Sequence, residues 1–235
     1  MSRPRILLSS WQQSLITPSH PSEELATLGV AYLDAVRRAG GVPLMAPHAQ
    51  DAGEVESLLS VVDALVLTGG QDIDPAAYGA ANEASVGVRP EADAADLRLL
   101  AGALDRHLPV LGVCRGLQLA NLFFGGDLLQ EVRSRDNSDH PLADPATLHD
   151  HRHTIEIEAG SRLATIYQAG PLEVGSLHHQ AIARLADGLI ATALTSGGVV
   201  EAVEARNHDL IAVQWHPELH ANGDALFVDV VERAR

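Results

Sequence analysis

Short apolar runs alternate with amphipathic stretches along the first half of the chain. The apolar runs predict buried strands over Arg5–Ser9, Val42–Ala46, Ala64–Leu67 and Val110–Val113. The stretches between them carry the spacing of helices over Glu23–Ala39, Gly53–Val61, Asp93–His107 and Gly116–Phe123. Strands that alternate with helices indicate βαβ units. The pattern therefore predicts an α/β fold with a mostly parallel central sheet and helices on both faces.

The pattern changes after about His153. Polar and apolar positions alternate in His153–Glu158, Ile190–Thr195 and Val199–Ala205, as in strands with one solvated face. We therefore expect a small antiparallel portion in the C-terminal half. The apolar run Leu210–Gln214 is expected to return to the central sheet, and Ala225–Arg233 to form a last helix.

No linker or repeat divides the sequence, so we expect one domain over residues 1–235. The stretch Ser134–Asp150 is rich in Asp, Pro and His. A segment of that length and composition predicts a long mobile loop.

The net charge of the chain decides against some classes of binding partner. The chain has 16 basic and 31 acidic residues, for a formal net charge of -15. Such a surface repels phosphate backbones and anionic lipids, so we expect no nucleic acid and no membrane partner. Lysine is absent, which excludes a Schiff-base lysine and the lysine of a P-loop.

The single cysteine excludes an intrachain disulfide. The N-terminal segment MSRPRILLSS lacks the long apolar run and the cleavage site of a signal peptide. No stretch approaches the roughly 20 apolar residues of a membrane helix. We therefore expect a cytoplasmic protein.

The segment Leu111–Gln118, with the sequence LGVCRGLQ, is the strongest chemical signal. A predicted strand runs into Gly-x-Cys-x-Gly, and a predicted helix follows at once. This is the sulfur counterpart of a nucleophile elbow, and it sets Cys114 at a helix N-terminus that favours the thiolate. A lone cysteine is more often a buried structural residue. The two flanking glycines favour a nucleophile here.

A thiolate nucleophile needs a histidine base and a group that orients the histidine. His216 and Glu218 follow the predicted strand Leu210–Gln214. Residues two apart on an extended segment share a face, and Pro217 favours an extended backbone at His216. The chain has 12 histidines, so a solvated surface pair is the alternative. The position at the end of a core strand favours the catalytic interpretation.

Gly69 and Gly70 directly follow the predicted strand Ala64–Leu67. A glycine pair there lets backbone N–H groups approach a substrate. One of them, with the N–H of Arg115, could form an oxyanion hole, although a plain turn would look the same. Asp72 and Asp74 lack the rest of a calcium loop, so we interpret them as turn and capping residues.

Two histidine groups raise the question of a metal. His178 and His179 have no Cys, His or acid at zinc-type spacing, so a pocket wall is favoured over a metal site, with a solvated loop at even odds. His149, His151 and His153 alternate and would share a face. With no acidic partner evident nearby, they form a weak metal candidate that we leave out of the site.

Several segments together resemble the class I glutamine amidotransferase-like superfamily: Gly112–Gln118, Gly125–Gln130, Leu177–Ala181 and Gln214–Glu218. Within that superfamily, Gly69–Pro75 followed by Tyr78 and Gly79 is similar to the γ-glutamyl-γ-aminobutyrate hydrolase family, peptidase family C26. The resemblance extends from about Gly69 to Glu218. It implies a flavodoxin-like α/β fold with a Cys-His-Glu triad.

The resemblance also implies roles for individual residues. Cys114 would be the nucleophile, His216 the acid and base, and Glu218 the orienting carboxylate. Backbone N–H groups of Gly70 and Arg115 would form the oxyanion hole. The substrate-binding residues would be Gly69, Gln118, His178 and His179. No metal and no cofactor is expected, and a homodimer is suggested by the resemblance alone.

The chain departs from the family pattern at two places. Gly175-Ser176 stands where Asn-Ser is usual, and Ala92-Asp93 stands where Arg-Asp often heads the helix. Neither departure touches the triad, but both could alter the pocket for the leaving amine.

The function expected from the residues and the resemblance is hydrolysis of a γ-glutamyl amide through a cysteinyl thioester, with a small γ-glutamyl molecule as substrate. The alternative is a glutaminase subunit that supplies ammonia to a separate synthetase. A third hypothesis, an inactive ligand-binding or thiol-sensing protein, is disfavoured because it has no need for His216 and Glu218.

Overall fold

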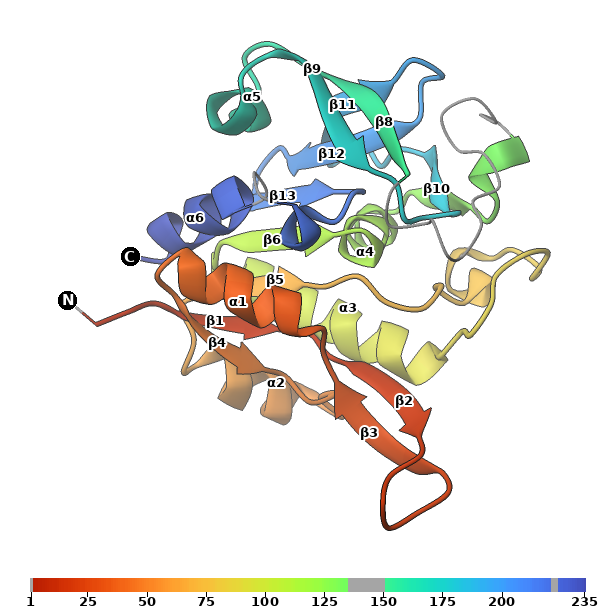
Figure 1. The fold of residues 1–235 in the computed structure, drawn as a ribbon, viewed down its shortest axis with the longest axis vertical. Helices are drawn as coiled ribbons and strands as arrows, with labels where there is room; N and C mark the ends of the chain where they lie inside the picture. The colour runs from red at the N-terminus through yellow and green to blue at the C-terminus, as the bar shows by residue number, and fades with distance from the viewer. Residues whose placement is uncertain (1, 135–150, 221–223) are drawn as a thin grey trace.

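A nine-stranded mixed sheet forms the centre of the computed structural model, which describes residues 2–134, 151–220 and 224–235 (Figure 1). Its parallel part runs in the order β4 (Val42–Met45), β1 (Arg5–Leu8), β5 (Ala64–Leu67), β6 (Val110–Val113) and β13 (Leu210–Val213). The sheet then continues with antiparallel pairs through β12 (Val200–Ala205), β11 (Leu189–Thr195), β8 (Arg152–Ile157) and β9 (Gly170–Gly175).

The parallel strands are short apolar runs because both of their faces are buried. In β1, Ile6 and Leu8 pack into one core cluster and Leu7 packs into the other. The two clusters lie on opposite faces of the sheet, as the alternation of side chains along a strand requires.

Helices cover both faces of the parallel part. The first cluster takes side chains from α1 (Val30–Arg38), α5 (Arg162–Tyr167) and α6 (Asp224–Arg233). The second takes side chains from α2 (Ala52–Leu59), α3 (Pro90–Asp105) and α4 (Arg115–Phe123). This arrangement confirms the expected flavodoxin-like α/β fold.

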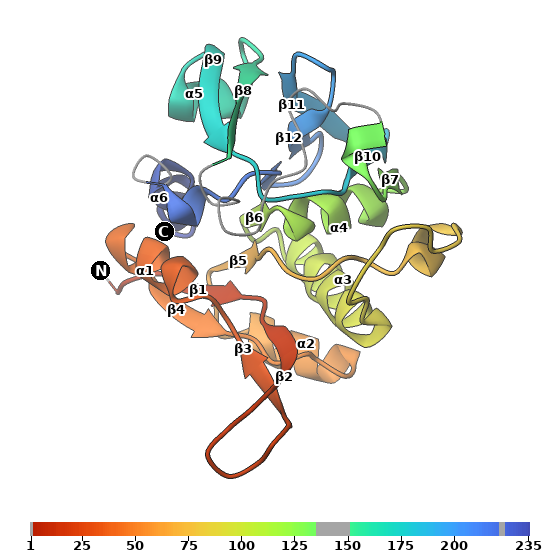
Figure 2. The same ribbon diagram turned by 45° about the vertical axis from the view of Figure 1, so that its right-hand side comes forward.

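One predicted helix is wrong in its first half. Residues 23–39 were expected to be helical, but β3 (Glu23–Thr27) pairs antiparallel with β2 (Trp11–Leu15), and only Val30–Arg38 is helix. Cross-strand pairing outweighs the helix propensity of Glu-Glu-Leu-Ala, because Trp11 faces Thr27 across the hairpin. The hairpin extends away from the sheet (Figure 1 and Figure 2).

The antiparallel part lies at the opposite end of the molecule from that hairpin (Figure 2). It includes β9 and α5, which the sequence pattern did not predict. A further small antiparallel sheet joins β7 (Asp127–Leu129) to β10 (Ala181–Arg184). Single turns of 3-10 helix occur at Pro75–Tyr78, Val132–Ser134 and Pro217–Leu219. Of the expected loop Ser134–Asp150, residues 135–150 lie outside the described residues.

Within the described ranges, no helix combines the length and the apolar character needed to cross a membrane.

Candidate active site

Cys114 occupies the tight turn between β6 and α4. Its backbone has φ 51° and ψ -102°, a conformation that costs an L-residue energy and that surrounding contacts must hold in place. Its N–H donates to the carbonyl of Val213 at 2.7 Å. The residue is the N-cap of α4, so the positive end of the helix dipole lies at the thiol. The elbow expected from the sequence is present.

The flanking glycines leave no space for a side chain. A Cβ at Gly116 would lie 2.3 Å from the carbonyl oxygen of Leu67, and one at Gly112 would lie 2.7 Å from the Cβ of Ala212. Backbone atoms at the first contact cannot move aside cheaply. Gly116 therefore lets α4 pack closely against β5, and Gly112 leaves room on β6 for Gly116 of α4 and for Ala212 of β13.

His216 and Glu218 follow β13, which pairs directly with β6. Val213 stands opposite Val113, so the segment after β13 leaves the sheet next to the elbow. The Nδ1 of His216 donates to Oε1 of Glu218 at 2.7 Å, and the Glu218 side chain is buried. This hydrogen bond fixes the ring and leaves Nε2 for the thiol.

Gly69 makes room for the imidazole. A Cβ at Gly69 would lie 2.7 Å from Cε1 of His216. The N–H of Gly69 donates to the hydroxyl of Tyr32 at 2.9 Å, and that hydroxyl lies 3.4 Å from Nδ1 of His216. Trp11, in the β2–β3 hairpin, donates from Nε1 to the Gly69 carbonyl. Gly69 thus leaves room for the ring of His216 and holds the Tyr32 hydroxyl beside it.

The pKa of His216 is raised to about 10. Burial by itself lowers this pKa, but the charge of Cys114 and the hydrogen bonds to Cys114 and Glu218 raise it by more. The protonated imidazolium is therefore the favoured form of His216 in this site. Burial also raises the pKa of Tyr32, and nearby Glu218 adds to the effect, so the Tyr32 hydroxyl keeps its proton.

Two glutamines complete the surroundings of the thiol. Gln214 is fully buried, and its Nε2 donates to Sγ of Cys114 at 3.5 Å. Gln118 donates from Nε2 to Oε1 of Gln214 at 3.3 Å and to the carbonyl of Gln180 at 3.3 Å. Sequence reasoning missed the side-chain role of Gln214, although its place directly after the core strand was a signal.

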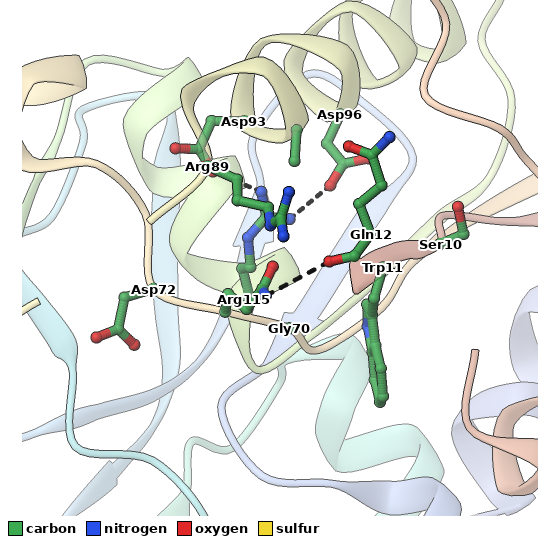
Figure 3. Close-up of a pocket in the computed structure, with 11 residues that line it drawn as sticks. Ser10, Trp11, Gln12, Gly70, Asp72, Arg89, Asp93, Asp96 and Arg115 are labelled. Atoms are coloured by element: carbon green, nitrogen blue, oxygen red, sulfur yellow. Dashed lines mark hydrogen bonds and ion pairs between the residues drawn. The ribbon is translucent and has the colours of Figure 1, made fainter. Parts of the chain in front are cut away.

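Arg115 follows the nucleophile, and its side chain is buried. The guanidinium lies between two carboxylates of α3, at 2.6 Å from Asp93 and 2.5 Å from Asp96 (Figure 3). These carboxylates raise the pKa of Arg115 against the effect of burial, so it stays charged. These ion pairs hold the side chain of Arg115. Its backbone N–H, at the first position of α4, is the group that could donate a hydrogen bond to an oxyanion.

Gly70, the other expected oxyanion donor, lies against the same arginine. A Cβ at Gly70 would be 3.1 Å from Cδ of Arg115. Gly70 and Arg115 both line a pocket that also contains Trp11, Asp72 and Arg89 (Figure 3). The structure therefore brings the two predicted donors together, while their role remains a prediction.

The predicted pocket histidines point to different partners. Nε2 of His179 contacts Asp72 at 2.9 Å, and this hydrogen bond raises the pKa of His179. His178 instead directs its ring toward Glu201, at 3.4 Å. Asp72 also accepts from the N–H of Val86, whereas Asp74 caps the turn that follows it, as expected.

The histidines that the sequence groups near β8, His149, His151 and His153, are only partly within the described residues. His149 lies outside the described residues, and His153 of β8 is buried with Nε2 at 3.5 Å from Glu201. The acidic partner that sequence reasoning did not find is therefore Glu201 of β12, which is distant in sequence. No local spacing could have indicated it.

Of the two departures from the expected family pattern, Gly175 has a structural reason, whereas Ala92 has no structural explanation and it is the retained Asp93 beside it that has a structural role. Asp93 takes part in the Arg115 ion pair and also accepts from the N–H of Asp74 at 2.9 Å. The ring of His220 occupies the space next to Gly175, where an added Cβ would lie 2.4 Å from Nε2 of His220.

Comparison with known proteins decides the family. The model of the family described as Peptidase C26 matches residues 9–218, which include every residue placed above in the elbow and the histidine–glutamate pair. The chain belongs to the peptidase C26 family.

Two relatives of the chain, which carry different names, show how similar it is to known proteins. It is 39% identical over 86% of its length to "Putative glutamine amidotransferase Rv2859c" of Mycobacterium tuberculosis, of which it covers 66%. It is 31% identical over 85% of its length to the gamma-glutamyl-gamma-aminobutyrate hydrolase PuuD of Escherichia coli K12, of which it covers 82%.

Among solved structures, the chain resembles a "putative gmp synthase subunit a protein" of Thermoplasma acidophilum, with a TM-score of 0.68 and 17% identity. The likeness covers 100% of this chain and 95% of that one. At this identity it shows the shared fold alone.

The close approach at Gly116 predicts a large loss of stability in Gly116→Ala. The added Cβ meets the Leu67 carbonyl, so we expect a loss of about 2–3 kcal/mol in the free energy of unfolding. Gly79→Ala is the matched control, because Gly79 has φ 73° but open space around a Cβ, and should lose only about 1 kcal/mol. Urea unfolding of both variants measures the difference. Equal losses would contradict the steric explanation.

The raised pKa of His216 predicts an alkaline limit to activity. As pH rises through about 10, His216 loses its proton. The sulfur of Cys114 then loses its counter-ion, and the leaving amine of the expected substrate loses its proton donor. Glu218→Gln removes a group that raises this pKa, so the falling limb of kcat/KM should move to lower pH. The exposed Glu56→Gln variant, assayed on the same substrate, should keep the original limb. An unmoved limb in Glu218→Gln would refute the assignment of Glu218.

Proposed function

We propose that this C26 peptidase hydrolyses γ-glutamyl amides through a thioester on Cys114. The observation that carries the proposal is a thiol on a strained elbow, beside a histidine whose Nδ1 is held by Glu218 at 2.7 Å. This is the constellation of a nucleophile, a base and an orienting group. The relatives named gamma-glutamyl-gamma-aminobutyrate hydrolase support a γ-glutamyl substrate.

The proposed reaction has two steps. The Cys114 thiolate attacks the γ-carbonyl, and the oxyanion is stabilised by the N–H groups of Gly70 and Arg115. The C–N bond then breaks, His216 gives its proton to the departing amine, and a thioester remains. In the second step His216 takes a proton from water, the hydroxide attacks the thioester, and glutamate leaves as the thiolate re-forms with the returned proton on His216.

The walls of the site offer groups for the glutamyl head, which carries an ammonium and a carboxylate. The carboxylate of Asp72, paired with His179, and the guanidinium of Arg89 line the region next to Gly70. Gln118 reaches the thiol region through Gln214. We propose that these groups, with Gly69, select a γ-glutamyl substrate. His178 is buried against Glu201, so we propose that it acts on the pocket only through the backbone of its loop.

A second function is favoured by the relatives that are named glutamine amidotransferases. A glutaminase subunit would use the same triad on glutamine and pass ammonia to a synthetase. The difference lies in what the chain does alone, because the hydrolase needs no partner protein.

The deciding experiment assays the purified chain on glutamine and on a panel of γ-glutamyl amines, with glutamate and the free amine identified as products. We expect turnover of at least one γ-glutamyl amine without any partner. Cys114→Ala should lower kcat by about 10³-fold or more while circular dichroism and the unfolding midpoint stay unchanged. Activity that appears only with an added synthetase supports the second function. Unchanged turnover in Cys114→Ala would refute both proposed functions.

The contact between Gly175 and His220 predicts a determinant of the leaving amine. His220 follows Glu218 closely, and burial lowers its pKa, with the nearby Arg152 adding to the effect, so the ring is neutral where an amine would depart. Gly175→Asn should displace this ring and change the ratio of kcat/KM between two γ-glutamyl amines by about fivefold or more.

His220→Ala provides the control for that change. Once the ring is absent, adding Gly175→Asn should alter the ratio little further, because the two residues act through one contact. Independent, additive effects of the two substitutions would show that His220 does not carry the selectivity.

A further inference from the structure

Three side chains that are far apart in sequence meet in the antiparallel part of the fold, apart from the triad. They are His153 of β8, His178 in the loop after β9, and Glu201 of β12. Nε2 of His153 lies 3.5 Å from one carboxylate oxygen of Glu201, and Nε2 of His178 lies 3.4 Å from the other. One ligand atom from each residue lies within 4.8 Å of the other two.

The cluster is buried. The exposed fractions of the side chains are 1% for His153, 2% for His178 and 0% for Glu201. Burial to this extent favours positive charge next to a carboxylate. A cation bound between the three side chains would supply such a charge.

The hydrogen bond of His178 to a backbone carbonyl identifies the tautomer of its ring. Nδ1 of His178 lies 2.9 Å from the carbonyl oxygen of Gln180, which can only accept, so Nδ1 carries the proton. In the neutral ring, Nε2 is then an acceptor, and it faces a carboxylate oxygen that is an acceptor as well. Histidine ligands of metals are commonly fixed by a hydrogen bond of this kind from the second ring nitrogen to a backbone carbonyl.

The distances fit a shared ion better than direct hydrogen bonds. Charge-assisted N–H···O bonds are typically about 2.7–2.9 Å long. Two ligands of a tetrahedral zinc ion, each at about 2.0–2.1 Å from it, lie about 3.3 Å apart. The separations of 3.4 and 3.5 Å at Glu201 match the second value.

We propose that His153, His178 and Glu201 bind a divalent transition-metal ion of the zinc type. Two imidazole nitrogens and one carboxylate are a donor set that Zn²⁺ accepts, and three protein ligands leave one tetrahedral position for water. The proposal is independent of the reaction on Cys114, because none of these three residues belongs to the triad.

The ion would stabilise the segments next to the candidate active site. The carbonyl of Gln180 accepts from both His178 and Gln118, so fixing His178 also fixes the loop against the glutamine beside the thiol. On the other side, the carbonyl of Glu201 accepts from the N–H of Gln214 at 2.7 Å. The proposed role is therefore to hold the two segments that carry Gln118 and Gln214 in register.

The test measures metal binding directly. The full-length chain and its Cys114→Ala variant, which removes the thiol as a competing ligand, are stripped with a chelator, given Zn²⁺ and desalted. Mass spectrometry of the bound metal should find one Zn²⁺ per chain in both. Co²⁺ in place of Zn²⁺ should give the intense visible absorption of a tetrahedral site, and Zn²⁺ should raise the unfolding midpoint.

Variants distinguish this site from binding elsewhere on the protein. Glu201→Gln and His153→Gln, made in the Cys114→Ala background, should bind Zn²⁺ at least about 10-fold more weakly and lose the stabilisation. His20→Gln and Glu173→Gln, which change exposed residues, should bind as the parent does. If Glu201→Gln does not fold, His153→Gln decides.

Absence of stoichiometric Zn²⁺ in the parent would overturn the proposal. Uptake that survives the cluster substitutions unchanged would overturn it equally, because the ion would then bind at other histidines.

Discussion

The close packing of α4 against β5 is the constraint on which the site depends. Because the first turn of α4 passes the carbonyl of Leu67 without room for a Cβ at Gly116, the chain must turn sharply as it leaves β6. The residue at that turn, Cys114, takes up the strain with φ 51° and ψ -102°. Its thiol is thereby set at the helix N-terminus and held there by the core.

The rest of the site follows from strand pairing. β13 pairs with β6 and ends beside it, so His216 arrives at the thiol although it lies far along the sequence. β5 also pairs with β6, so Gly69 and Gly70 leave the sheet at the same edge. The parallel sheet brings three short motifs to one edge without any further device, which is why α/β folds place ligands there.

This explains what the sequence could predict. Each motif of the candidate site is local: a strand end followed by glycine, cysteine or histidine, which can be predicted from apolar runs and spacing. The parallel core was predictable for the same reason. The β2–β3 hairpin was not, since Glu23–Thr27 has helix-forming residues and becomes a strand only through its pairing with Trp11–Leu15. The contact of Glu201 with His153 and His178 was not predictable either, because antiparallel pairing brings these residues together from distant parts of the sequence.

Among the residues that the structure describes around the thiol, His216 is the group that can act as its counter-ion. The chain carries a formal net charge of -15, and the arginine next to the nucleophile gives no net help, because Asp93 and Asp96 both contact its guanidinium. The two carboxylates together outweigh the single cation. Gln214 and the dipole of α4 supply partial charges only. The positive charge beside the thiol is therefore that of His216, whose pKa is raised despite burial first by the charge of Cys114 and the hydrogen bond to it, and then by Glu218. In this fold Glu218 both holds the ring through Nδ1 and adds to the charge that favours the imidazolium.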